Sequence, residues 1–167
     1  GERRWFRELL PEDFEPHRHQ EQAWGRLYWR AGESTLVASG TGSGKTECFL
    51  YPILDYCRLM RGRKGIKAIL IYPMNALATD QAKRLAGMIW RHPDLHGQVT
   101  AGLYIGEQPR QPAPVMTEEE VITDKEFLRQ APPDILLTNY KMLDYLLIRP
   151  RDYRLWRDNE PETLKYL

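Results

Sequence analysis

A glycine-rich run, Ser39-Gly40-Thr41-Gly42-Ser43-Gly44-Lys45-Thr46, contains the residue types that bind the phosphates of a nucleotide. Glycines let the backbone turn tightly, so that several N–H groups can point at one phosphate. Lys45 would supply a positive charge to the β- and γ-phosphates, and the Thr46 hydroxyl would ligate Mg²⁺. The run lies between the apolar segment 35–38 and the helical pattern of 46–60. This order predicts a strand, a phosphate-binding loop and a helix; the alternative is a glycine-rich turn that happens to contain Lys-Thr.

The elements that must position this loop follow from the apolar pattern. Short apolar runs predict strands over 35–38, 67–72, 99–105 and 135–138, and apolar residues at helical spacing predict helices over 17–30, 46–60, 75–91 and 139–148. Pro52 is expected to kink the second helix or to shorten its first part. Strands that alternate with helices predict an α/β fold, with a parallel sheet covered by helices on both faces.

Segment 106–133 departs from this alternation because it contains several prolines and the acidic patch 118–120. We expect a surface excursion with one short helix, whose acidic residues form a solvated face rather than a binding site. The four arginines Arg149, Arg151, Arg154 and Arg157 are interleaved with Asp152 and Asp158. They are consistent either with a strand-binding surface or with a solvated, salt-bridged face, and the second interpretation is favoured.

Composition limits the class of protein. The 167 residues are 42% hydrophobic and 28% charged, which is typical of one globular domain. No apolar run approaches the roughly 20 residues that cross a bilayer, and no signal peptide is evident. The formal charge of +1 neither requires nor excludes a nucleic-acid partner. Cys48 and Cys57 form no metal-binding pattern, so a reduced, cytoplasmic protein without membrane contact is expected.

The phosphate loop has Ser39 where the strict pattern has glycine. With this departure the run resembles motif I of superfamily 2 helicases of the DEAD/DEAH-box type. Upstream, His19-Gln20-Glu21-Gln22-Ala23-Trp24 resembles the Q motif of these helicases. The resemblance implies that the amide of Gln20, which is both a donor and an acceptor, binds adenine. The alternative is a surface glutamine on an amphipathic helix.

Three further segments resemble motifs with which these helicases bind a nucleic-acid strand. Tyr72-Pro73-Met74-Asn75-Ala76-Leu77 resembles motif Ia, Tyr104-Ile105-Gly106-Glu107 stands at the place of a glycine-containing strand-end motif, and 133–143 resembles the Ib-type motif. The resemblance implies backbone contacts from Pro73, Asn75, Ala76, Gly106, Thr138 and Asn139. Asn75 as a helix N-cap is an alternative compatible with such a contact. Four apolar residues that follow Asn139 are expected to pack in the core: Met142, Leu143, Leu146 and Leu147.

Hydrolysis in this family requires an Asp-Glu pair at the end of a strand, with the Asp holding Mg²⁺ and the Glu polarising water. None of the predicted strands ends in that pair. We expect residues 162–167 to begin the next strand and the chain to stop just before the pair. The predicted organisation is therefore an N-terminal extension, 1–14, and a partial, incomplete RecA-like ATP-binding domain, 15–167.

The resemblance implies ATP and Mg²⁺ as cofactors, and a DNA or RNA backbone and a second RecA-like domain as partners. The phrases at 44–50 and 72–77 look like those of large bacterial helicases of the Lhr-like or anti-phage DISARM kind. The expected function is the ATP-binding portion of a helicase or translocase. Two alternatives stay open at this point: a non-catalytic truncated motor that binds a protein or a nucleic acid, and another nucleotide-binding protein such as a small-molecule kinase or a GTPase.

Overall fold

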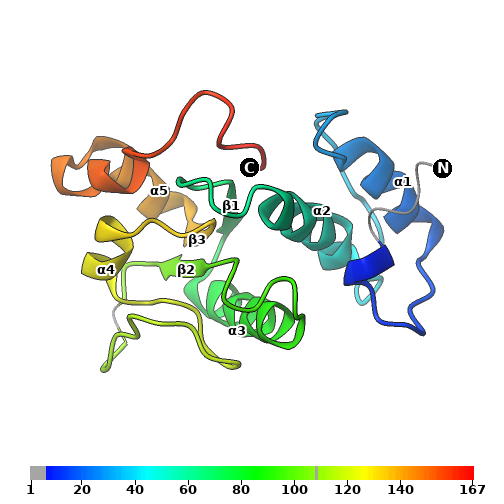
Figure 1. The fold of residues 1–167 in the computed structure, drawn as a ribbon, viewed down its shortest axis with the longest axis horizontal. Coiled ribbons are helices and arrows are strands. Elements are labelled where there is room, and N and C mark those ends of the chain that lie inside the picture. The colour runs from blue at the N-terminus through cyan, green and yellow to red at the C-terminus, as the bar shows by residue number, and fades with distance from the viewer. Residues whose placement is uncertain (1–6, 108) are drawn as a thin grey trace. The chain divides into compact units, whose positions relative to one another are not determined.

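The structure is a computed structural model that describes residues 7–107 and 109–167, so part of the predicted extension 1–14 lies outside the described residues. The chain divides into two compact units, Gly1–Leu59 and Met60–Leu167. We call them the N-terminal and the C-terminal unit and describe each by itself. Their elements are labelled in Figure 1.

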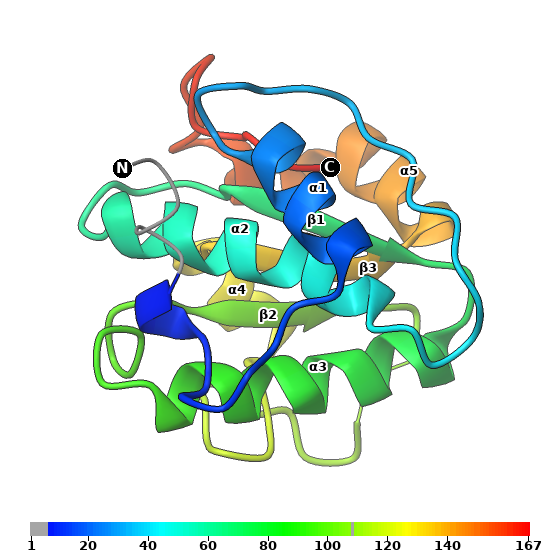
Figure 2. The ribbon, with the colours of Figure 1, turned by 90° about the vertical axis from the view of Figure 1, so that its right-hand side faces the viewer.

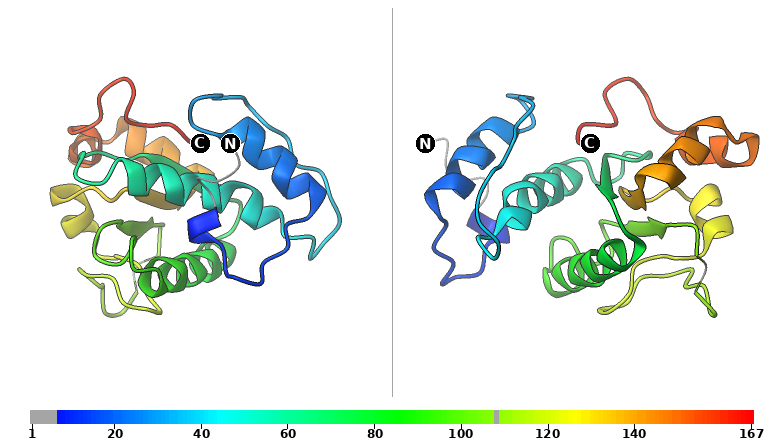
Figure 3. Two further views of the ribbon diagram at one scale, coloured as in Figure 1. Left: turned by 45° about the vertical axis from the view of Figure 1, so that its right-hand side comes forward. Right: turned by 180° about the vertical axis from the view of Figure 1, so that it is seen from behind.

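The N-terminal unit contains the short 3-10 helix η1 (Arg7–Leu9) and the helices α1 (Arg18–Leu27) and α2 (Lys45–Leu59). The two α-helices lie against each other (Figure 3). Three aromatic rings pack together in this unit and connect α1 to α2. The ring centroid of Trp24 lies 6.1 Å from that of Tyr51. The ring centroid of Phe14 lies 6.4 Å from that of Trp24 and 6.0 Å from that of Tyr51. Helix α2 runs through Pro52, so this proline does not shorten it.

The segment 35–38, which the sequence predicts as a strand, forms no strand in this structure. Its Leu36 side chain is 92% exposed. A strand needs a neighbouring strand to pair its backbone N–H and C=O groups. The described part of the N-terminal unit contains no strand with which 35–38 could pair. The prediction of a strand before the phosphate loop is therefore wrong here, whereas the helix after the loop is confirmed.

The C-terminal unit confirms the predicted parallel α/β arrangement. In chain order it contains β1 (Ala68–Tyr72), α3 (Asn75–Arg91), β2 (Ala101–Tyr104), α4 (Lys125–Gln130), β3 (Ile135–Asn139), α5 (Tyr140–Ile148) and the 3-10 helix η2 (Pro150–Trp156). The three strands form a parallel sheet in the order β1-β3-β2 (Figure 2). The sequence predicts four strands, and the described sheet lacks the one at 35–38. The 3-10 helix η2 was not predicted.

Helices cover both faces of this sheet, as expected (Figure 3). Ile69, Leu136 and Tyr104 alternate onto one face and pack in a core with residues of α4, α5 and η2. Gly102 of β2 lies on the same face, beside Leu136. A Cβ added at Gly102 would lie 2.4 Å from a methyl group of Leu128, so the glycine lets α4 pack closely on the sheet. The other face is covered by α3, and half of the buried residues of this helix are alanines.

Both outer edges of the sheet are extended by single bridges. Tyr166 pairs in parallel with Ala68 of β1, and its carbonyl accepts a hydrogen bond of 3.0 Å from the N–H of Ile69. Residues near 166 therefore enter the sheet, as the sequence predicts. On the other edge, Ile122 pairs with Gly102 of β2. The excursion 106–133 thus has the one short helix expected of it, α4, but also contributes a buried residue to the sheet.

The strands are tied at their N-terminal ends by a buried ion pair. The Lys67 ammonium lies 2.6 Å from one Asp134 carboxylate oxygen, and the other oxygen accepts a 2.8 Å hydrogen bond from the N–H of Thr100. The acidic patch forms exposed ion pairs at the surface: Arg91 lies 2.8 Å from Glu118, and Lys83 lies 3.7 Å from Glu119. The interpretation of that patch as a solvated, ion-paired face is consistent with this geometry.

Candidate nucleotide and nucleic-acid sites

The phosphate loop has the backbone geometry that its glycines predict. Gly42 and Gly44 adopt φ angles of +74° and +72°, in the left-handed region that favours glycine. A Cβ built at Gly40 or Gly42 would meet nothing within 4 Å, so the loop is open at these two positions. A Cβ at Gly44 would lie 2.4 Å from Nε2 of Gln20. The first two positions leave room for a phosphate against the backbone, whereas Gly44 is needed for packing as well.

Lys45, the first residue of α2, directs its ammonium back over the loop. Its Nζ donates hydrogen bonds of 2.8 Å and 2.6 Å to the carbonyl oxygens of Ser39 and Gly40. The Ser39 and Ser43 hydroxyls are 2.6 Å apart and close the loop from its two sides. The positive end of the α2 dipole adds to the charge of the ammonium at this point. The loop therefore concentrates positive potential and backbone donors in the way that anion binding requires.

Gln20 supports this loop from α1. The side chain is only 2% exposed, and its Nε2 donates a 3.0 Å hydrogen bond to the carbonyl of Gly44. Its Oε1 accepts a 2.8 Å hydrogen bond from the N–H of His17. His19, on the same helix, places Nε2 2.8 Å from the Ser43 carbonyl oxygen. The alternative of a surface glutamine is therefore wrong, and α1 contacts the loop through two side chains.

Thr46 lies on the first turn of α2 and is half-buried. Among the described residues no group of three or more His, Cys, Asp or Glu side chains gathers that could hold a metal ion. Thr46 can therefore offer one hydroxyl oxygen to a Mg²⁺ ion, and the remaining ligands would be phosphate and water oxygens. The donor set fits a nucleotide-bound Mg²⁺ better than a metal held by protein alone.

The predicted nucleic-acid contacts meet at one edge of the sheet in the C-terminal unit. Register places Ile71, Thr138 and Tyr104 side by side, and Tyr72 beside Asn139. The segments after these residues, which contain Pro73, Asn75, Ala76 and Gly106, therefore leave the sheet at its carboxyl edge. Such an edge is where open parallel sheets bind ligands.

The individual side chains at this edge differ in exposure. Pro73, Ala76 and Gly106 are exposed, whereas Asn75 and Asn139 are half-buried. The last two are joined by a hydrogen bond of 2.7 Å from Asn139 Nδ2 to Asn75 Oδ1, and the Asn139 side chain caps α5. This hydrogen bond therefore holds the N-terminus of α3 next to the N-terminus of α5.

Thr138 is fully buried, and its hydroxyl donates a 2.7 Å hydrogen bond to the carbonyl of Tyr104. The hydroxyl therefore ties β3 to β2 within the sheet. The segments that follow β2 and β3 at the carboxyl edge are held together in this way.

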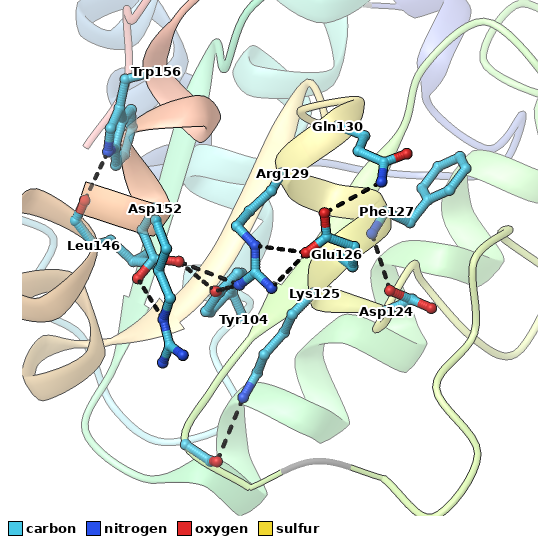
Figure 4. Close-up of polar contacts among 12 residues, drawn as sticks. Tyr104, Asp124, Lys125, Glu126, Phe127, Arg129, Gln130, Leu146, Asp152 and Trp156 are labelled. Carbon is cyan, nitrogen blue, oxygen red and sulfur yellow. Dashed lines mark hydrogen bonds and ion pairs between the residues drawn. The ribbon is translucent and has the colours of Figure 1, made fainter. Parts of the chain in front are cut away.

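A buried polar cluster joins β2, α4 and η2 (Figure 4). The Tyr104 hydroxyl donates a 2.6 Å hydrogen bond to the fully buried Asp152 carboxylate, and it accepts one of 2.6 Å from Arg129. Burial and the neighbouring carboxylate raise the pKa of Tyr104 to about 12. Sequence reasoning missed this cluster because Asp152 alternates with arginines, a pattern typical of a solvated face.

The chain belongs to the DEAD/DEAH box helicase family, whose sequence model matches residues 17–167. Among curated proteins it is similar to the Druantia protein DruE of Escherichia coli (strain UMEA 4076-1), with 40% identity over 77 residues, 42% of this chain and 4% of DruE. It is also similar to the ATP-dependent rRNA helicase SPB4 of Encephalitozoon cuniculi (strain GB-M1), with 44% identity over 59 residues, 34% of this chain and 12% of that protein.

Two solved structures share the fold. The helicase Lhr of Mycobacterium smegmatis, bound to ssDNA and AMP-PNP, aligns with a TM-score of 0.64 and 25% identity over 89% of this chain and 18% of its own. The DUF1998 helicase MrfA, bound to DNA and AMPPNP, aligns with a TM-score of 0.66 and 23% identity over 91% of this chain and 19% of its own. The chain thus spans less than a fifth of either helicase. Every helix within the described residues is too short or too polar to cross a membrane.

Proposed function

We propose that this chain is the ATP-binding portion of a helicase or translocase, which in the full-length protein uses ATP hydrolysis to move along DNA. The observation that carries the proposal is the geometry of Lys45, whose ammonium is held over an open, left-handed glycine loop at the N-terminus of α2. The AMP-PNP bound to the similar helicase Lhr supports a nucleotide at this loop.

The loop residues divide the work of binding a triphosphate. The N–H groups of 40–44 and the α2 dipole attract the anion, and the Lys45 ammonium balances its charge. Mg²⁺, when bound, neutralises phosphate charge, and Thr46 is the residue that would ligate it. Both polar atoms of the Gln20 amide are engaged, with Gly44 and with His17, so the proposed contact with adenine would require Gln20 to exchange one of these hydrogen bonds for the base.

We assign the nucleic-acid backbone to the carboxyl edge of the sheet, with Pro73, Asn75, Ala76, Gly106 and Asn139 as the contacting residues. Backbone N–H groups at the starts of α3 and α5 bind phosphate without reading sequence. The DNA bound to Lhr and MrfA supports DNA, whereas the name of the rRNA helicase SPB4 supports RNA as the alternative. A second RecA-like domain and a cytoplasmic location are part of the same proposal.

The test is Lys45→Ala in the full-length protein. We expect its ATP turnover to fall on the order of 100-fold or more, because the charge that stabilises the phosphoryl groups is lost. Binding of DNA without nucleotide should stay within about twofold of wild type, because Lys45 lies in a loop that the DNA contacts do not use. Lys64→Ala removes an exposed lysine elsewhere and serves as the matched control.

Two results would contradict this proposal. Retained turnover in the Lys45→Ala protein would show that the loop is not the catalytic nucleotide site. Loss of DNA binding in the absence of nucleotide would show that the division of roles is wrong. A wild-type protein that binds DNA without hydrolysing ATP would instead favour the non-catalytic module.

A further inference from the structure

Positive side chains gather beside Gly106, on the face of the sheet that α4, α5 and η2 cover. The Lys125 ammonium lies 3.5 Å from the carbonyl oxygen of Gly106 and 5.3 Å from the centroid of the Tyr104 ring. Partial burial lowers the pKa of Lys125, and the positive charges of Arg129, Arg151 and Arg149 lower it further. Lys125 therefore stands within electrostatic range of three arginines and of the Asp152 carboxylate, which acts on its pKa in the opposite direction.

The two carboxylates of this region are already used by one arginine. Arg129 lies 2.9 Å from Glu126 and 3.4 Å from the buried Asp152, which also accepts the Tyr104 hydrogen bond (Figure 4). Arg129 is itself largely buried by these contacts. It serves the internal cluster, and it shares the Asp152 carboxylate with Arg151.

The outer cations are oriented but not neutralised. Arg149 stacks on the Tyr145 ring at 3.7 Å from its centroid and has no ion pair among the described residues. Arg151 is 66% exposed and reaches Asp152 only at 4.0 Å. Farther along, Arg157 pairs with Asp158 at 3.4 Å. The interpretation of a salt-bridged face thus fits Arg157 closely and the exposed Arg151 only loosely, whereas the half-buried Arg149 stacks on a ring.

We propose that Lys125, Arg149 and Arg151 form a second phosphate-contact surface, which binds the nucleic-acid backbone beyond the point where it passes Gly106. This proposal rests on the proposed function, because Gly106 belongs to the assigned strand edge. Guanidinium groups suit phosphate oxygens, and stacking on Tyr145 fixes the direction of one of them in advance. Contact with Gly106 makes the surface continuous with that edge, which favours a nucleic acid over an acidic protein.

The experiment compares two triple variants of the full-length protein, each of which removes three positive charges. The first, K125A/R149A/R151A, removes the proposed surface. The second, K64A/K83A/R91A, removes exposed cations from the turn before β1 and from α3, on the opposite face of the sheet. Binding of single-stranded DNA oligonucleotides of increasing length is measured over a range of salt concentrations, and thermal unfolding confirms that both variants are folded.

We expect the first variant to lose affinity for long oligonucleotides by about tenfold or more, and to bind the shortest ones like wild type. Its slope of log affinity against log salt should be shallower by about 2, because each phosphate contact to a single strand contributes about 0.7. The second variant should keep the wild-type slope, since its cations are paired with Glu119 and Glu118 or lie away from the edge.

Equal slopes for the first variant and wild type would overturn the proposal, and so would an equal loss in both triple variants. Loss of binding to polyglutamate without any loss of DNA binding would also overturn it, in favour of an acidic protein partner. The Asn75→Ala variant distinguishes failure of the second surface from failure of the proposed function. If Asn75→Ala weakens DNA binding while K125A/R149A/R151A does not, the carboxyl edge of the sheet binds DNA and only the proposal of a second surface is wrong. A wild-type protein with no affinity for any oligonucleotide would instead refute the proposed function.

Discussion

Gly44 combines two reasons for being glycine, a left-handed backbone and a neighbour too close for a Cβ. Gly40, four residues earlier in the same loop, has neither. We predict that Gly44→Ala lowers the free energy of unfolding by about 1–2 kcal/mol or more, because alanine resists positive φ and would displace Gln20. Gly40→Ala should change it by less than about 0.5 kcal/mol. Urea denaturation measures both, and equal losses would show that the loop is not held as described.

The predicted site residues differ in how far their side chains are free to bind. Gln20 and Thr138 are buried and hydrogen-bonded within the protein, whereas Pro73 and Gly106 are exposed. The first two therefore position the loop and the sheet edge in this structure. Contact with a ligand falls more readily to the exposed backbone beside them.

At the scale of elements, the hydrogen bonds of Tyr104 connect β2 to α4 and to η2, and the stability that they contribute depends on pH. The folded protein holds the pKa of Tyr104 at about 12, whereas an unfolded tyrosine has a pKa of about 10. The unfolded chain therefore loses this proton first as pH rises. The stabilisation from this group is complete below about pH 10 and is lost as pH rises through about 12.

We predict that the free energy of unfolding of the chain falls between about pH 10 and about pH 12, and that Tyr104→Phe makes this fall smaller. Below about pH 9 the same variant should be less stable than wild type, by about 1–3 kcal/mol, because Asp152 loses a hydrogen-bond donor. Urea unfolding at a series of pH values measures both effects. Burial also raises the pKa of Tyr72 to about 12, so Tyr72→Phe is the matched control without a bonded carboxylate. An unchanged pH dependence in Tyr104→Phe would contradict the assignment.

At the scale of the whole molecule, the sequence contains the phosphate loop but no strand that ends in an Asp-Glu pair. Glu47, Glu107 and the acidic patch do not replace such a pair, because none of them follows a described strand as Asp-Glu. We predict that the 167-residue chain by itself binds adenine nucleotide weakly and does not turn it over. A steady-state phosphate-release assay checks this prediction. Turnover that disappears in the Lys45→Ala chain would contradict it.

The sequence by itself determined the elements whose signals are local. The apolar runs at β1, β2 and β3, the helical spacing of α3 and the glycines around Lys45 each lie within one short segment. The parallel sheet followed from the alternation of strands and helices, and the register confirms it. The family resemblance, drawn from the same motifs, is confirmed by the match over 17–167.

Only the tertiary structure decided what depends on a partner distant in sequence. Segment 35–38 is apolar enough for a strand, but a strand forms only where another strand pairs with it. Asp152 turns inward because Tyr104, 48 residues away, offers a hydroxyl, and no local pattern distinguishes it from Asp158. Whether Arg149 faces a carboxylate or a tyrosine ring is settled by the same long-range packing. Sequence patterns report local preference, whereas burial, pairing and charge balance are properties of the assembled fold.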